Sequence, residues 1–95
     1  MSAQSPYAQA AELLDQLRTA ATVPNGARRA IATVVDALRY SHAPEEHVQA
    51  ASDISVAIHK LELALCLGNA ERQQEARARL DEIGESWPAL VLEAA

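Results

Sequence analysis

The sequence predicts an all-α protein, a compact bundle of four helices with a short fifth helix at the C-terminal end. Hydrophobic residues make up 49% of the 95 positions, many of them alanine, and phenylalanine is absent. Alanine is the best helix former and buries little area, which favours closely packed helices over sheet. Apolar residues also recur at helical spacing along most of the chain. Residues 1–95 are short enough to form one domain, in which we expect residues 1–5 to be frayed.

The stretch over residues 44–67 is predicted to be the central helix, because only its Pro44 is a helix breaker and proline suits a first turn. One apolar face has residues three or four positions apart: Val48, Ala51, Ile54, Ile58, Leu61 and Leu65. A second apolar face carries Val56, Leu63, Ala64 and Leu67. A helix that is apolar over most of its circumference needs neighbours on several sides. We therefore expect it to be covered nearly all round, with Cys66 as a small core residue.

Two helices are predicted before the central one. Ser5 and Pro6 are a good helix start, with serine as the cap and proline at the first helical position. The inner face of this first helix consists of Tyr7, Ala10, Leu13, Leu14, Leu17 and Ala21. Pro24-Asn25-Gly26 then turns the chain into a second helix over residues 27–40. Short connections of this kind allow neighbouring helices to pack antiparallel.

The chain after the central helix is predicted to form a fourth helix and a short fifth one. Gly68 ends the central helix, and Asn69 can cap a fourth helix that runs to about residue 83. Its solvent-exposed face carries two pairs of oppositely charged residues at i,i+4 spacing, Glu75 with Arg79 and Arg77 with Asp81. We expect Gly84 to close this helix and residues 86–92 to begin another, whose apolar side chains complete the core or contact a partner.

Net charge and the pattern of apolar residues exclude several classes of partner. The formal net charge of −5 opposes binding to nucleic-acid phosphates and suits contact with basic protein surfaces. His59, Lys60 and Glu62 interrupt the central apolar run, so we expect no membrane span. The start of the chain lacks a basic segment and an apolar core, so no signal peptide is expected. A single cysteine suits a reducing compartment, and we expect a cytoplasmic location.

No motif in the sequence supports catalysis, and no cofactor is expected. His42, Glu45, Glu46 and His47 form one dense group of metal-ligand types, but Pro44 prevents them from sharing one helical face. Capping and packing explain this group better than a metal site. The three glycines are isolated, so no phosphate-binding loop is present. We therefore expect a protein that is not an enzyme.

His59 is the remaining candidate for chemistry. His59-Lys60-Leu61-Glu62-Leu63 resembles in part the pattern of histidine phosphotransfer domains, which is His, any residue, Leu, Lys and Gly. This resemblance implies a regulatory domain that accepts phosphate on His59. Glu62 stands in place of the lysine and would repel a phosphate. The other interpretation is a solvated histidine stabilised by its neighbours one turn away.

Several charged residues are candidates for protein binding. Arg28 and Arg29 lie in a predicted first helical turn, where they oppose the helix dipole at a cost of about 0.3–1 kcal/mol each. Either a carboxylate elsewhere in the fold or a partner protein would neutralise them. The other candidates are Arg39, Tyr40, His42, Glu45 and Glu46 at the corner before the central helix, and Asp53 on its edge. Acidic residues are interleaved with the arginines after residue 70, so no direct nucleic-acid binding is expected.

Residues 60–88 resemble one tetratricopeptide repeat. The matching small and large positions are Leu63, Ala64, Leu67, Ala76, Leu80 and Pro88. The expected aromatic residue at position 60 is a lysine, and the expected small residue at position 83 is an isoleucine. The resemblance covers about a third of the chain and no second copy is apparent. It implies a helical adaptor.

A further resemblance is one of kind, not of motif. A short, acidic, helical chain without catalytic residues is similar to the small inhibitors that phages and mobile elements encode, including anti-CRISPR proteins of type I systems. This resemblance implies an inhibitor in the cytoplasm of a bacterial host that docks on a subunit of a larger nucleic-acid-targeting complex. The alternative is a structural homodimer that buries the apolar C-terminal segment, residues 87–92.

Overall fold

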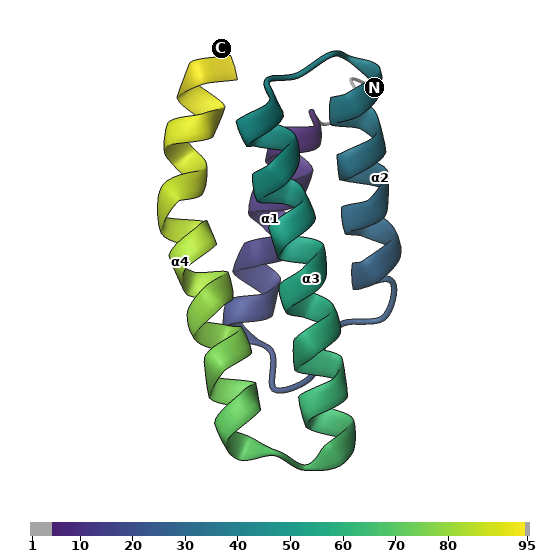
Figure 1. Cartoon of the computed structure of the whole chain (residues 1–95), viewed down its shortest axis with the longest axis vertical. Coiled ribbons are helices and arrows are strands. Elements are labelled where there is room, and N and C mark those ends of the chain that lie inside the picture. Colours follow the sequence, from purple (N-terminus) through teal and green to yellow (C-terminus); the bar gives the residue numbers. More distant parts are fainter. Residues whose placement is uncertain (1–4, 95) are drawn as a thin grey trace.

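A computed structural model describes residues 5–94 and confirms the all-α class. The described chain forms four helices: α1 (Pro6–Thr19), α2 (Ala27–Tyr40), α3 (Glu45–Leu67) and α4 (Ala70–Ala94). They run alternately down and up, and each packs against its sequence neighbours, while α4 closes the ring against α1 (Figure 1). Ser5 caps α1, as predicted, by accepting a hydrogen bond from the Ala8 amide at 3.1 Å, so it does not belong to a frayed segment. The rest of the predicted frayed segment, residues 1–4, lies outside the described residues.

The core lies along the axis of the bundle and draws on all four helices. Its largest fully buried apolar side chains are Ile31, Val34, Leu38, Ile54, Ile58, Leu61 and Trp87. Buried alanines such as Ala10, Ala51 and Ala57 occupy the positions between them. Small side chains of this kind let helices approach closely, so an alanine-rich chain with few aromatic residues still forms a continuous core.

The predicted fifth helix is wrong, because its residues continue α4 without a break to Ala94. Gly84 and Pro88 are both poor helix residues. Gly84 lies between the buried side chains of Ile83 and Trp87, and Pro88 directly follows Trp87. Ile83 and Trp87 are one turn apart and both face the core, and the Trp87 indole donates a hydrogen bond to the Tyr7 carbonyl of α1 at 2.9 Å. Tertiary packing therefore overrides local propensity here.

The α2–α3 and α3–α4 connections use the same helix-ending motif with different residues. At the end of α3, Gly68 takes the left-handed conformation, and the Asn69 amide bonds back to the Ala64 carbonyl at 2.9 Å. At the end of α2, His42 takes that conformation with φ 58°, and the next amide bonds back to the Leu38 carbonyl at 2.9 Å. The pattern is a Schellman motif, in which glycine is the usual left-handed residue. Asn69 also caps α4, as predicted.

Arg77 does not form the predicted surface pair with Asp81. Its guanidinium instead reaches across to the C-terminal end of α1 and donates hydrogen bonds to three carbonyls, those of Leu17, Ala20 and Ala21, at 3.4, 3.1 and 2.8 Å. The last carbonyls of a helix lack partners within it. Arg77 therefore ties α4 to the end of α1.

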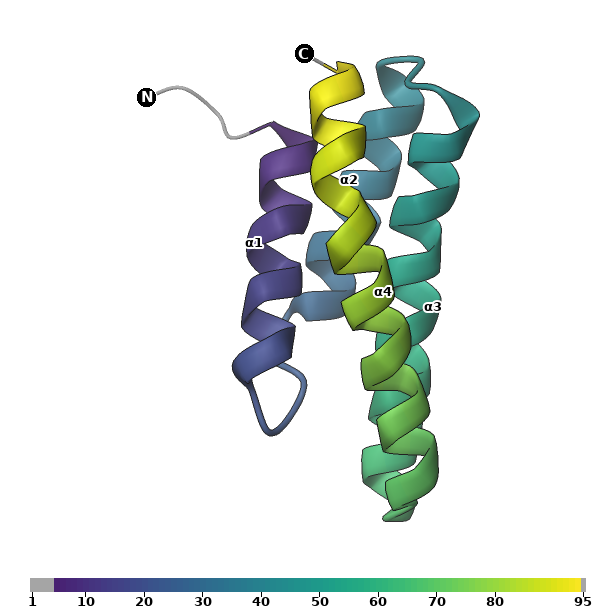
Figure 2. The ribbon, with the colours of Figure 1, turned by 90° about the vertical axis from the view of Figure 1, so that its left-hand side faces the viewer.

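The prediction that the central helix is covered nearly all round is wrong. Helix α3 packs mainly against α2 and α4, and its last turns extend with the first turns of α4 past the α1–α2 connection (Figure 2). Val56, Leu63 and Leu67 are about half or more exposed, at 50%, 49% and 72%. Cys66, predicted to be a core residue, is exposed on the same projecting part. A helix in a ring of four has only two close neighbours, so it cannot bury two wide apolar faces.

Candidate functional site

The binding residues predicted from the sequence do not form one surface. Arg28 and Arg29 begin α2, whereas Arg39 and Tyr40 end it. A helix of 14 residues is about 21 Å long, so these two pairs lie at opposite ends of α2 and far apart. The structure therefore presents separate candidate surfaces.

The two arginines at the start of α2 have different surroundings. The Arg28 guanidinium lies 3.9 Å from the Glu62 carboxylate of α3, so a carboxylate elsewhere in the fold partly neutralises it. Both side chains are exposed enough that this pair contributes at most about 1 kcal/mol. Arg29 is exposed and has no ion pair within residues 5–94.

The corner between α2 and α3 brings several predicted residues together. Arg39, His42 and Glu45 line one shallow hollow. Tyr40 is 90% exposed, which is unusual for an aromatic side chain. Glu46 is exposed nearby but does not line the hollow. This corner therefore offers charged and hydrogen-bonding groups in one hollow, and Tyr40 is exposed outside that hollow.

Asp53 lies on the edge of a different and larger hollow. Its carboxylate accepts hydrogen bonds from Arg79 of α4 at 3.2 Å and from Gln49 at 3.0 Å. Arg79 also pairs with Glu82 at 3.2 Å, whereas the sequence predicted a pair with Glu75. Asp53 is thus held inside the protein's own network at one end of the groove between α3 and α4.

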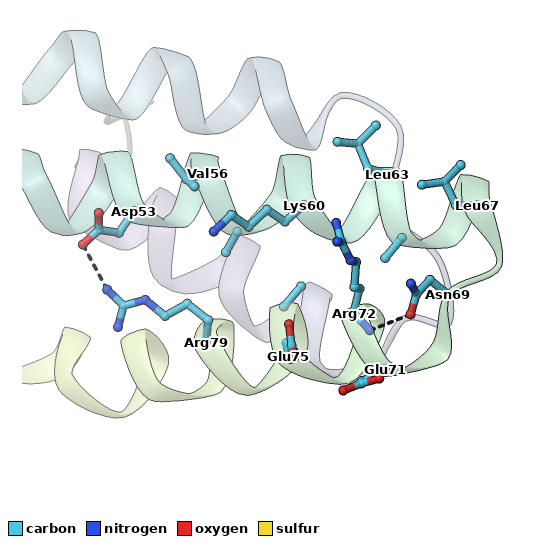
Figure 3. Close-up of a pocket in the computed structure, with 13 residues that line it drawn as sticks. Asp53, Val56, Lys60, Leu63, Leu67, Asn69, Glu71, Arg72, Glu75 and Arg79 are labelled. Carbon is cyan, nitrogen blue, oxygen red and sulfur yellow. Dashed lines mark hydrogen bonds and ion pairs between the residues drawn. The ribbon is translucent and has the colours of Figure 1, made fainter.

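The groove between α3 and α4 has a volume of about 920 Å³, compared with about 380 Å³ for the hollow at the α2–α3 corner. Its floor consists of the buried alanines Ala57, Ala64 and Ala76, whose short side chains leave the space open. The apolar wall consists of the exposed side chains of Val56, Leu63 and Leu67, which line the hollow from α3. In Figure 3 they stand on the edge of α3 that is turned away from α4. We call this surface the α3–α4 groove.

The charged residues of the α3–α4 groove differ in whether they already have partners. Asp53 and Arg79 bond to each other across one end of it (Figure 3). The Arg72 side chain reaches from α4 toward α3, and the Lys60 side chain lies along α3 (Figure 3). Neither has an ion pair or side-chain hydrogen bond among the described residues. Glu71 points away from α3, whereas Glu75 lines the groove, also without an ion pair in the described part. Two cations and one carboxylate without ion pairs therefore line the groove.

A second polar group, inside the bundle, joins three helices through His47. This imidazole is only 1% exposed. Its Nδ1 lies 2.7 Å from the Tyr7 hydroxyl of α1, and its Nε2 lies 2.8 Å from the Glu93 carboxylate of α4. A carboxylate only accepts hydrogen bonds, so Nε2 carries the hydrogen and the neutral Nδ1 accepts from the Tyr7 hydroxyl. Every polar atom of this buried histidine is thereby satisfied.

The order hydroxyl, imidazole, carboxylate is also that of a nucleophilic triad, but the pKa of the hydroxyl is shifted in the direction opposite to activation. Burial, together with the nearby Glu93 charge, raises the pKa of the Tyr7 phenol above its ordinary value. An activated nucleophile needs the opposite shift. Neither the hollow at the α2–α3 corner nor the larger hollow between α3 and α4 is lined by Tyr7, His47 or Glu93. The hydrogen bonds of this group join α1, α3 and α4.

His59 and the predicted cluster of metal-ligand types lie apart from any enclosed site. His59 is exposed on α3. His42 and His47 do not converge, because His47 turns into the core while His42 stays in the exposed connection. Within residues 5–94 no three histidine, cysteine, aspartate or glutamate side chains come close enough to hold a metal ion.

Comparisons with known proteins do not extend this description. No family model, no curated protein and no solved structure matches the chain. No helix in the described part is long and apolar enough to cross a membrane.

Sequence reasoning missed the principal residues of the α3–α4 groove. It assigned Val56, Leu63 and Leu67 to a covered face, and it treated Arg72 as neutralised by nearby acids. The useful signal was present, because α3 has more apolar circumference than the two close neighbours available in a four-helix ring can bury. A surplus apolar face on one helix of such a bundle indicates an exposed surface.

Proposed function

We propose that this protein is a non-enzymatic protein-binding module that docks on a larger protein through the α3–α4 groove. The observation that carries this proposal is the exposure of Val56, Leu63 and Leu67 in one groove. Apolar patches with a polar rim are typical of protein-binding surfaces. The charged residues around the groove would then provide the rim.

The specific form that we propose is an inhibitor of the anti-CRISPR kind, which docks on a subunit of a nucleic-acid-targeting complex in a bacterial host. Its support is the small size of the chain, its net charge of −5 and the suitability of an acidic surface for contact with basic nucleic-acid-binding proteins. The corner with Arg39, Tyr40 and His42 would be a secondary contact, since an exposed tyrosine beside an arginine is typical of binding hot spots.

Affinity capture from a bacterial lysate, with the full chain as bait, tests the docking surface. The groove variant is Leu63→Ser/Leu67→Ser, and the matched control is Val91→Ser/Leu92→Ser, which removes exposed apolar side chains from the far end of α4. Both changes are on the surface, so both variants should keep the helical circular dichroism of the wild type. We expect the wild type and the control to retain one stoichiometric partner that the groove variant loses.

The capture experiment has two outcomes against the proposal. Equal capture by the groove variant and the wild type would remove the α3–α4 groove as the docking site. Absence of any stoichiometric partner would overturn the binding function itself. Charge reversal at Arg28/Arg29 and at Glu45/Glu46 then tests the surfaces predicted from the sequence, and loss of the partner on either reversal would move the site to that end of α2.

A further inference from the structure

We propose that the occupant of the α3–α4 groove is an acidic amphipathic helix of the partner protein. This inference rests on the proposed function and adds the chemistry of the partner. It follows from the spacing of the apolar side chains and from the charges that border them.

The apolar wall has the length and period of a helix. Val56, Leu63 and Leu67 lie on one face of α3, seven and four residues apart, and span about 16 Å along the helix axis. A partner helix of three to four turns with apolar residues at the same period would pack along this wall. The alanine floor leaves the space between α3 and α4 open for its side chains.

The charges select an acidic helix over a basic one. Lys60 and Arg72 line the groove without a carboxylate partner in the described part of the chain, although the whole protein is acidic. The acidic residues of the same region are less available, because Asp53 is bonded to Arg79 and Glu71 points away from α3. Glu75 lines the groove one turn from each of its two arginines and has no ion pair in the described part, so it offsets one of the two cations and leaves one in excess. Carboxylates on the flank of the incoming helix would pair with Lys60 and Arg72 beside the apolar contact.

Synthetic peptides test this inference with the full chain and fluorescence anisotropy. The acidic probe is a helical peptide with leucines at the period of the groove and glutamates on its flanks. The second probe replaces each glutamate with lysine, and the third has the composition of the first in scrambled order. A duplex oligonucleotide is the fourth probe. We expect the chain to bind the acidic helical peptide. Its affinity for each of the other three probes should be at least about tenfold lower.

Two charge-reversed variants with the same change in net charge identify the contact. Lys60→Glu/Arg72→Glu alters the groove, whereas Arg18→Glu/Arg29→Glu alters exposed arginines at the end of α1 and the start of α2. The groove variant should lose about tenfold or more in affinity for the acidic peptide, and the control variant should lose little. Leu63→Ser/Leu67→Ser should weaken binding of the same peptide.

Several results of these binding measurements would overturn the acidic-helix inference. Equal binding of the lysine or scrambled peptide, equal loss in the two charge variants, or absence of peptide binding would do so. Preferential binding of the oligonucleotide would assign the cations to phosphate. A dimer that light scattering detects and that Leu63→Ser/Leu67→Ser dissolves would assign the groove to a second copy. The proposed function and the acidic-helix inference can fail separately. If the peptides do not bind, but the wild type captures a larger protein that Leu63→Ser/Leu67→Ser does not, the proposed function is still supported.

Discussion

The hydroxyl of Tyr7 lies 2.7 Å from Nδ1 of His47, and this hydrogen bond joins α1 to α3 across the core. The Tyr7 ring also meets the His47 ring edge to face, with centroids 5.5 Å apart. Because the imidazole is buried, its free nitrogen has no access to water when the hydroxyl is removed. The stability of the bundle should therefore depend on one oxygen atom of Tyr7.

Tyr7→Phe should lower the free energy of unfolding by about 1–3 kcal/mol, the cost of leaving a buried acceptor unsatisfied. Urea denaturation followed by circular dichroism measures this change. The matched control is Tyr40→Phe, which removes the same oxygen from a side chain that is 90% exposed and should have almost no effect. Equal effects in the two variants would show that the Tyr7–His47 hydrogen bond does not stabilise the fold.

Tyr7 should also make the protein less stable in alkaline solution. Burial raises the pKa of its phenol above 10.0, and the Glu93 charge raises it further. Below pH 10.0 the phenol is protonated in the folded and unfolded states, so its contribution to stability is complete. Above that pH the unfolded phenol loses its proton first, and the contribution declines as the pH rises through the raised pKa of the folded state.

Urea denaturation at a series of alkaline pH values checks this dependence. The difference in free energy of unfolding between the wild type and Tyr7→Phe should shrink as the pH rises above 10.0. Tyr40→Phe serves as the control and should follow the wild-type curve, because its ring is exposed. A difference that stays constant with pH would contradict the assignment.

The fold class was predictable because apolar periodicity decides it, and periodicity is a local property of the chain. The bounds of α2 and α3 were predictable from the apolar periodicity together with the helix-start and helix-stop residues Pro44, Gly68 and Asn69. The continuity of α4 did not follow, because local propensity at Gly84 and Pro88 argues for a break. The spacing of Leu80, Ile83 and Trp87 carries the same helical register across Gly84, and it was the better guide.

The site was less predictable than the fold, because it depends on which helix faces are left without a neighbour. Leu63 and Leu67 have the same apolar character as the buried Leu61, and only the arrangement of helices distinguishes them. The His47 link could not be read from the sequence either. Its partners Tyr7 and Glu93 are 40 and 46 residues away, so no local pattern connects them.

Gly84→Ala should stabilise the protein by about 0.5–1 kcal/mol, since alanine is a better helix former and a Cβ at this position would meet nothing within 4 Å. Thermal and urea unfolding measure the gain. The matched control is Gly68→Ala, where the space is equally open but the backbone is left-handed with φ 66°. This second change should cost about 1–2 kcal/mol. Destabilisation by Gly84→Ala would indicate that α4 depends on flexibility at Gly84.

His42→Gly should stabilise the protein by about 1 kcal/mol. His42 holds a left-handed conformation, φ 58°, which is unfavourable for a residue with a side chain and free of strain for glycine. The Schellman hydrogen bonds around it involve only backbone atoms and would remain. His59→Gly is the control, because the same change inside α3 should cost about 1 kcal/mol in unfolding free energy. A loss of stability in His42→Gly would show that its side chain contributes more than its backbone costs.

The projecting turn between α3 and α4 lies at the opposite pole of the molecule from the start of α1 and the end of α4 (Figure 1). A resin, dye or fusion domain attached at either of these ends would therefore leave Leu67 and its neighbours unobstructed. If the protein is immobilised through the start of α1 or the end of α4, the projecting α3–α4 turn with Leu67 faces the solution. The same bait could then be used for capture and for peptide titration without masking the surface under test.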